Sequence, residues 1–213
     1  MKKLTTLLFA VTLLVGFSSV TMAQSSANAT ISANANVVQD MVVGTDFEDL
    51  EFNNILVNSG KFIDATDGSV DATTGTAVGI TGGETRGYFS IEIISGTNVD
   101  VTLTVPSNLE DDSSNTLQIG FDESGIGDET GNLNGLLTET EPTGTASVTA
   151  ITGGAGSNFT FASGDGEWDL DSAITMPNSG KVYLALGGEV QASSNQELGS
   201  YTGDIILTAT VAD

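Results

Sequence analysis

The sequence predicts an all-β protein, a single antiparallel β-sandwich, from three observations. Apolar residues recur at every second position in many short segments, which is typical of strands with one buried face. Clusters of Gly, Asn, Asp and Ser separate these segments at intervals of roughly 8 to 12 residues, the turn spacing of a sandwich. No window keeps the period of an amphipathic helix. We therefore expect about nine to eleven short strands.

The two C-terminal apolar runs give the clearest strand pattern. In the last run, residues 199–211, Ile205 and Leu207 share one parity with the other apolar residues, and threonines fill most of the opposite parity. A polar segment, residues 193–199, connects this run to the preceding one, residues 181–192. We expect the two runs to form a β-hairpin around which the other strands are arranged.

The strongest earlier pair of strands is Tyr88–Ser95 and Val99–Val105, and Pro106 ends it because proline has no ladder N–H. Gly187 and Gly188, inside an apolar run, indicate a bulge or a close backbone approach. Shorter strand patterns lie at residues 27–38, 41–44, 50–52, 55–57, 76–80, 116–121, 146–151 and 158–161. The expected buried residues are Phe89, Ile91, Ile93, Val101, Leu103, Leu184, Leu186, Ile205 and Leu207.

Residues 1–23 have the pattern of a secretory signal peptide. Lys2 and Lys3 precede an apolar stretch, and small residues at Thr21 and Ala23 match a cleavage site after Ala23. The alternative is a membrane anchor, but the apolar stretch is shorter than the roughly 20 residues that a span needs. We expect an exported protein, extracellular, on the cell surface or periplasmic, with one β-sandwich domain at residues 24–213.

The charge and composition of the chain restrict the classes of partner that it can bind. After residue 23 the chain has 3 bases and 28 acids, a net charge of 3 − 28 = −25. Nucleic acid and anionic membrane surfaces are therefore disfavoured, because both attract cationic protein surfaces. Such a negative charge favours the binding of cations and is typical of proteins that are soluble at high salt. The chain has no cysteine, so disulfides cannot support the fold.

The sequence disfavours an enzyme and identifies no catalytic residue. It contains no histidine and no cysteine, which excludes Ser-His-Asp and Cys-His catalysis and zinc sites made by those residues. Paired carboxylates could still serve a glycosidase. With 28 acids, however, some pairs lie close together by chance.

Calcium is the one cofactor that the acidic loops could hold, because carboxylates on Gly-containing loops suit hard cations. The main candidate ligands are Asp165, Glu167, Asp169 and Asp171; two other loops carry Asp64, Asp67 and Asp71, and Asp122, Glu123, Asp128 and Glu129. None follows a known calcium-loop pattern. The alternative is that these loops are merely solvated.

Two aromatic residues have both a structural and a functional interpretation. Trp168 could stack on a carbohydrate, or it could fill the core with its indole N–H bonded at the edge. Tyr201, at the start of the last strand, resembles a tyrosine-corner residue whose hydroxyl ties a loop to the sandwich.

Several motifs resemble those of a family of secreted bacterial domains of unknown function, similar to spore-coat-U and fimbrial pilin-like proteins. The motifs are Phe89–Gly96 followed by Val99–Pro106, then Leu186–Val190 followed by Gly199–Gly203, and an early Leu50–Phe52. The resemblance implies an Ig-like, pilin-like β-sandwich at the cell surface or in an extracellular appendage. It carries over no catalytic residue.

The leading functional hypothesis is a non-enzymatic structural or adhesive surface protein, with a fimbrial-type subunit as its most specific form. Its partners would be like subunits or other surface proteins. The alternative is a monomeric extracellular module that binds carbohydrate or calcium. Because the chain has many strand segments, we expect residues 27–38 to pair within their own subunit rather than to complete a neighbour.

Overall fold

The computed structural model describes residues 41–74, 82–126, 131–151, 159–162 and 166–212. The predicted signal peptide and residues 27–38 lie outside these ranges. The described part is all-β, and its fourteen strands are β1 (Val42–Glu48), β2 (Ser59–Ile63), β3 (Val70–Thr74), β4 (Gly87–Glu92), β5 (Asn98–Thr104), β6 (Asn108–Glu110), β7 (Thr116–Gly120), β8 (Gly135–Thr138), β9 (Phe159–Ala162), β10 (Glu167–Leu170), β11 (Ile174–Thr175), β12 (Lys181–Leu186), β13 (Gly188–Ala192) and β14 (Ile206–Val211). Within the described residues, no helix has the length and apolar character needed to cross a membrane.

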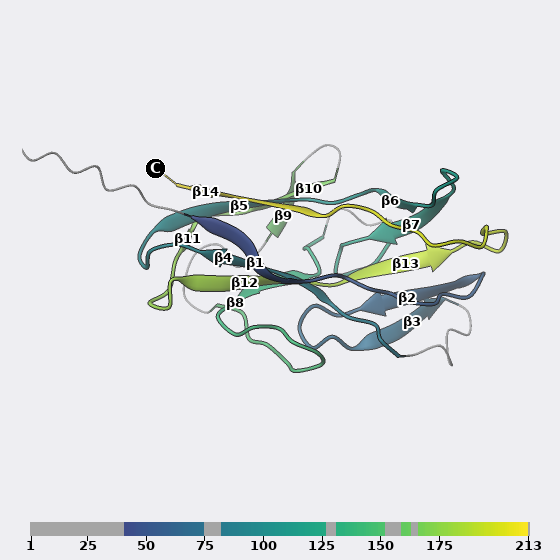
Figure 1. Cartoon of the computed structure of the whole chain (residues 1–213), viewed down its shortest axis with the longest axis horizontal. Helices are drawn as coiled ribbons and strands as arrows, with labels where there is room; N and C mark the ends of the chain where they lie inside the picture. The colour runs from purple at the N-terminus through teal and green to yellow at the C-terminus, as the bar shows by residue number, and fades with distance from the viewer. Residues whose placement is uncertain (1–40, 75–81, 127–130, 152–158, 163–165, 213) are drawn as a thin grey trace, which may run out of the picture. The chain divides into compact units, whose positions relative to one another are not determined.

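The strands form three antiparallel sheets in a sandwich-like arrangement (Figure 1). The first sheet has the order β1-β4-β12-β8, and the third has the order β3-β2-β13-β7-β6. The second has the order β11-β5-β10-β9, with β14 also paired to β5. One core cluster draws side chains from all three sheets, including Ile91 of the first, Leu103 of the second and Ile119 of the third.

The prediction of a C-terminal β-hairpin is wrong. Residues 181–192 divide into β12 and β13, which belong to different sheets. β14 pairs instead with β5, from Ile206 opposite Thr104 to Val211 opposite Val99. The alternation of β14 is nevertheless real. A period of two indicates which face of a strand is buried, but it does not indicate the neighbouring strand.

The chain changes sheets at Gly187, where the predicted close backbone approach is confirmed. A Cβ atom there would lie 2.1 Å from the carbonyl oxygen of Ile63 and 2.8 Å from the amide nitrogen of Ala65. The Gly187 N–H donates to the backbone oxygen of Asn134, whose side chain in turn bonds Ile63 and Ala65. Only glycine fits this corner without displacing backbone.

The predicted core is confirmed in large part. Buried residues are Ile91, Ile93, Val101, Leu103, Leu184 and Leu186; partly buried residues that pack against the core are Phe89, Ile205 and Leu207. Residues 146–151, expected to be a strand, form none; backbone bonds from Val148 to Thr66 and from Ile151 to Leu137 hold this loop. The expected strand at residues 76–80 lies outside the described residues.

Candidate functional site

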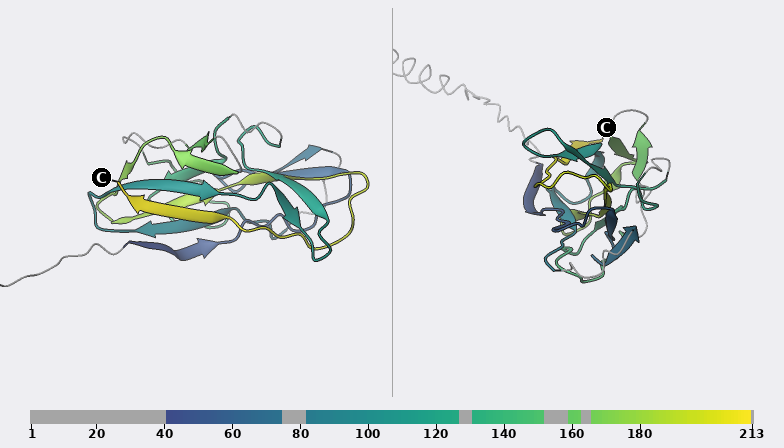
Figure 2. Two further views of the ribbon diagram at one scale, coloured as in Figure 1. Left: turned by 90° about the horizontal axis from the view of Figure 1, so that it is seen from above. Right: turned by 90° about the vertical axis from the view of Figure 1, so that its right-hand side faces the viewer.

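One hollow of the described structure is a groove with an apolar floor, which we call the seam groove. One wall is drawn from residues 47–57, which begin at the end of β1, and the other from residues 196–205, which precede β14. The cavity volume is about 1080 Å³. Figure 2 shows β1 and β14 running in opposite directions along the same side of the molecule. Backbone bonds from Glu51 to Thr85 and from Glu110 to Thr202 fasten the two walls to neighbouring segments.

The floor of the seam groove is apolar and already well packed. Leu117, Ile119 and Leu186 line it and belong to the core cluster. Phe89 and Leu109 also line it and are only partly buried. An occupant must therefore contact an apolar floor without inserting bulky side chains deeply, because a close-packed interior does not accept added volume.

The rim of the groove exposes both apolar and acidic side chains. Phe47 is 59% exposed and Leu198 is 88% exposed. Together they place exposed apolar surface at the rim of the groove. The acids that line the groove are Glu48, Asp49, Glu51, Glu197 and Asp204. An acidic segment would therefore be repelled from the rim.

The edges of the sandwich meet beside this groove. Among the described strands, β1 pairs with β4 alone and β14 pairs with β5 alone. Each therefore presents one side that carries no strand partner in the described part of the chain. Such edges are templates for pairing with an additional strand.

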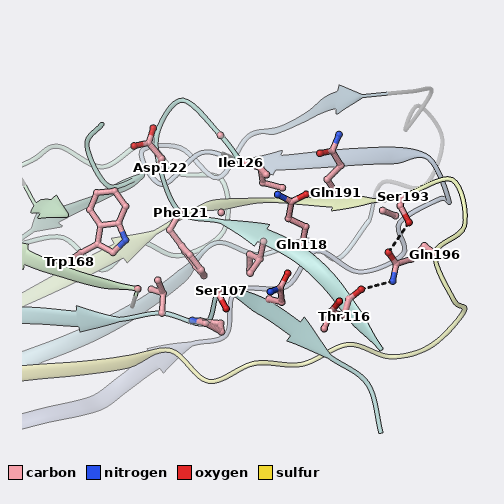
Figure 3. A pocket seen from close by; sticks show the side chains of 18 of the residues that line it. Ser107, Thr116, Gln118, Phe121, Asp122, Ile126, Trp168, Gln191, Ser193 and Gln196 are labelled. Atoms are coloured by element: carbon pink, nitrogen blue, oxygen red, sulfur yellow. Dashed lines mark hydrogen bonds between the residues drawn. The ribbon is translucent and has the colours of Figure 1, made fainter. Parts of the chain in front are cut away.

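The second hollow, which we call the amide pocket, lies over the outer face of the third sheet (Figure 3). Its volume is about 1170 Å³. Gln118 of β7 pairs directly with Asn108 of β6 on one side and with Gln191 of β13 on the other. Because side chains of directly opposite residues share a face, these three carboxamides form one row across three strands. We call them the amide row.

A loop closes one end of the amide pocket. Ile126 packs over Gly120, where a Cβ atom would lie 3.0 Å from the Ile126 Cα. The Ile126 N–H donates to the buried carboxylate of Glu189 at 2.7 Å. Asp122, 1% exposed, accepts a hydrogen bond from the Ser124 N–H at 2.6 Å and is the only charged residue among the described residues that line the pocket.

Gln196 closes the other end, and its position depends on Tyr201. The Gln196 side-chain amide donates to the Thr116 carbonyl and to the Tyr201 hydroxyl, each at 2.9 Å. The Tyr201 hydroxyl donates to the Glu197 carbonyl at 2.7 Å. Tyr201 lies before β14 rather than at the start of the last strand, and its hydroxyl bonds Glu197 within the same segment. The bond from Gln196 to Thr116 ties this segment to β7, and the segment also forms a wall of the seam groove.

Trp168 lies at the side of the amide pocket and belongs to the core. Its side chain is 2% exposed, and it pairs with Leu103 of β5 and Phe161 of β9 in the second sheet. It lines the pocket with little accessible surface. The described structure thus places Trp168 as a wall, and ligand stacking on its ring remains a prediction.

The predicted calcium ligands are only partly described. Asp165, Asp128 and Glu129 lie outside the described residues. Glu167, Asp169 and Asp171 are exposed, and Asp169 accepts a hydrogen bond from the Thr102 hydroxyl at 2.7 Å. Asp64 and Asp67 accept backbone N–H bonds within their own turn. No group of three acidic side chains within the described residues has the geometry to hold a metal ion.

The three bases of the described chain are all engaged with other groups. Lys61 pairs with Glu84 at 2.5 Å in a nearly fully buried ion pair. Lys181 pairs with Asp46 and Glu92. Arg86, 1% exposed, donates to backbone carbonyls. The two hollows consequently contain no basic side chain from the described residues.

Neither hollow was foreseen from the sequence. The amide row depends on the register of β6, β7 and β13, and the seam groove depends on two extended segments far apart in the chain. Comparisons with protein-family models, with curated proteins and with solved structures give no match for this chain.

Proposed function

We propose that the protein is a non-enzymatic structural subunit of an extracellular assembly, and that its seam groove takes an extended segment from a neighbouring copy. The observation that carries this proposal is the groove itself, which has an apolar floor and lies beside two sheet edges. Addition of a strand to such an edge joins subunits through main-chain hydrogen bonds, and side-chain pockets give specificity.

The proposed occupant is residues 27–38. This segment alternates small and polar residues and contains no charged residue, in a chain with 28 acids. An uncharged strand avoids repulsion from the acidic rim of the groove. The face formed by Ala29, Ile31, Ala33, Ala35 and Val37 is shallow, which suits a floor that is already packed. Fully extended, twelve residues span about 40 Å.

A neighbouring copy is a better source of this strand than the same chain. Only residues 39–41 separate the segment from β1, so its own chain could insert it only as a tight hairpin beside β1. This proposal replaces our sequence-based expectation that residues 27–38 pair within their own subunit.

The resemblance to pilin-like proteins supports the same conclusion, since it implies an Ig-like sandwich in an extracellular appendage. The absence of histidine and cysteine from the chain supports a role without catalysis. A protein secreted by a signal peptide at residues 1–23 would meet its copies outside the cytoplasm.

Electron microscopy and size-exclusion chromatography of residues 24–213 test the proposal. We expect chains of subunits from the unchanged protein. Ile31→Asp places a charge on the face that enters the groove and should abolish assembly, whereas Ser32→Asp places the same charge on the opposite face and should largely preserve it. Equal behaviour of the two variants would contradict the proposed strand orientation.

A truncated protein beginning at Asp40 separates insertion in trans from insertion in cis. If a neighbour supplies the strand, the truncated domain should bind a peptide of residues 27–38, and residues 24–213 should elute as oligomers. If residues 24–213 remain monomeric and do not bind the peptide, the segment fills its own groove and the proposal is wrong.

A further inference from the structure

We propose that the amide pocket binds a neutral saccharide, with the amide row as its recognition surface. The amide pocket shares Ile119, Ala192 and Gln196 with the seam groove, but the amide row lines the amide pocket alone, and the inference does not depend on assembly of subunits. It rests on the lining of the pocket, on the register of three strands, and on the contrast between this lining and the charge of the rest of the chain.

The lining offers several neutral hydrogen-bond donors and acceptors. Each carboxamide of the amide row carries two N–H donors and a carbonyl acceptor, which matches the dual donor and acceptor character of sugar hydroxyls. Ser107, Thr116 and Ser193 add hydroxyls around the row (Figure 3).

The strand register arranges these amides in line. Asn108, Gln118 and Gln191 are direct partners across β6, β7 and β13, so the row runs perpendicular to the strands. Neighbouring strands lie about 4.8 Å apart. This step is close to the length of one sugar unit, so an oligosaccharide lying across the strands would meet one amide at each successive unit.

The charge of the pocket selects against anionic ligands. Asp122 is the only charged residue that the described part of the chain contributes to the lining, and one of its oxygens accepts a hydrogen bond from the Ser124 N–H. No basic side chain of the described residues is present to hold an anionic sugar or a phosphate. The net charge of −23 would further repel an anion. A neutral ligand avoids both difficulties.

The apolar wall gives the pocket a second contact surface. Ile126 is half-buried and lines it beside the amide row, and the buried Phe121 and Trp168 lie behind this wall. The C–H face of a sugar ring would pack against Ile126 while its hydroxyls bond the amides. Trp168 then contributes as part of a rigid wall held in the core, rather than as an exposed platform.

Isothermal titration of residues 24–213 with cellohexaose, xylohexaose, mannohexaose and maltohexaose tests the proposal, with hexagalacturonate as the anionic comparison. We expect at least one neutral hexasaccharide to bind. Gln118→Ala removes the central amide and should weaken that binding roughly tenfold, as expected for one hydrogen bond. Gln118→Glu keeps the size of the side chain and should weaken it comparably. Asn178→Ala removes an exposed amide outside the pocket and should change nothing.

Three results would overturn the inference. The first is that no neutral hexasaccharide binds at millimolar concentration. The second is that binding persists unchanged in both Gln118 variants. The third is that only hexagalacturonate binds. Thermal unfolding of each variant shows whether it is folded, and oligomer formation by the Gln118 variants should match the unchanged protein, so failure here and failure of strand exchange are distinguishable.

Discussion

Arg86 shows how a single buried base holds two loops together. Its guanidinium donates to the carbonyl oxygens of Ala65 and Thr66 in one loop and to those of Pro142 and Ala146 in the other, at 2.6 to 3.0 Å. The planar fork of arginine reaches several acceptors at once, which a lysine ammonium at the same position cannot do. The guanidinium therefore supplies donors to backbone carbonyl oxygens that would otherwise be buried without hydrogen-bond partners.

Replacing Arg86 tests this role. Arg86→Lys leaves carbonyl groups without donors, and we expect it to lower the free energy of unfolding by about 3 kcal/mol. The midpoint of urea denaturation measures the loss, with the slope unchanged. Lys181→Ala removes a partly exposed base and should cost less than about 1 kcal/mol. Equal losses in the two variants would contradict the proposed role.

Tyr88 gives the fold a dependence on alkaline pH. Burial raises the pKa of its hydroxyl, and the hydrogen bond that it donates to Glu141 at 2.8 Å raises it further, to about 12. The neutral hydroxyl is therefore favoured in the folded state. Its contribution to stability is complete below the pKa of an unfolded tyrosine, about 10, and is lost as the pH rises through about 12.

We expect the stability of the protein to fall between pH 10 and 12 more steeply than the stability of Tyr88→Phe. Phenylalanine retains the ring and its edge contact with Tyr183 but has no proton to lose. Urea denaturation at several pH values measures both slopes. If the two proteins show the same slope, another group controls alkaline unfolding.

Glu84 makes the stability of the fold depend on pH at the acid end of the range. Burial raises the pKa of this carboxyl, but hydrogen bonds from Lys61 and from the Gly82 N–H lower it by more, so the pKa lies below its usual range. The stability that the ion pair contributes is present above the unfolded pKa and is lost as the pH falls through the folded pKa. Glu84→Gln should therefore flatten the stability profile below about pH 4.5.

At the scale of elements, the corner at Gly187 lets one apolar run, residues 181–192, supply a strand to each of two sheets. Gly187→Ala would place a methyl group 2.1 Å from a carbonyl oxygen of the β2 segment, and we expect a loss of at least about 3 kcal/mol. Gly199→Ala, where the nearest atom is a flexible carboxylate oxygen at 3.2 Å, is the matched control and should have a small effect. Thermal unfolding measures both changes.

The strand faces could be predicted from the sequence, and the strand partners could not. Ile91 and Leu103 follow the alternation and are buried as expected. β14 has a clear alternation too, but it pairs with β5, because register and partner depend on contacts between distant segments. The change of sheet at Gly187 was indicated only by two adjacent glycines. The amide row required that same unpredictable register, and its residues have no distinctive local pattern.

At the scale of the whole molecule, the acids have few basic partners. Lys61, Arg86 and Lys181 are all engaged with other groups, so they do not form basic patches on the described surface. Repulsion among exposed carboxylates therefore opposes both folding and the approach of a second copy. Salt weakens this repulsion, because the Debye length falls from about 30 Å at 0.01 M to about 3 Å at 1 M.

Assembly through the seam groove should consequently depend on salt and on the acids of the rim. We expect residues 24–213 to form longer oligomers at about 1 M NaCl than at about 0.01 M, as light scattering would show. Asp204→Asn removes one rim charge and should lower the salt concentration that assembly needs, because its carboxylate lines the groove where the incoming strand would lie. Asp112→Asn removes an exposed charge outside the groove lining and should have a smaller effect. If the two variants shift the salt requirement equally, net charge alone governs association and the groove is not where the copies meet.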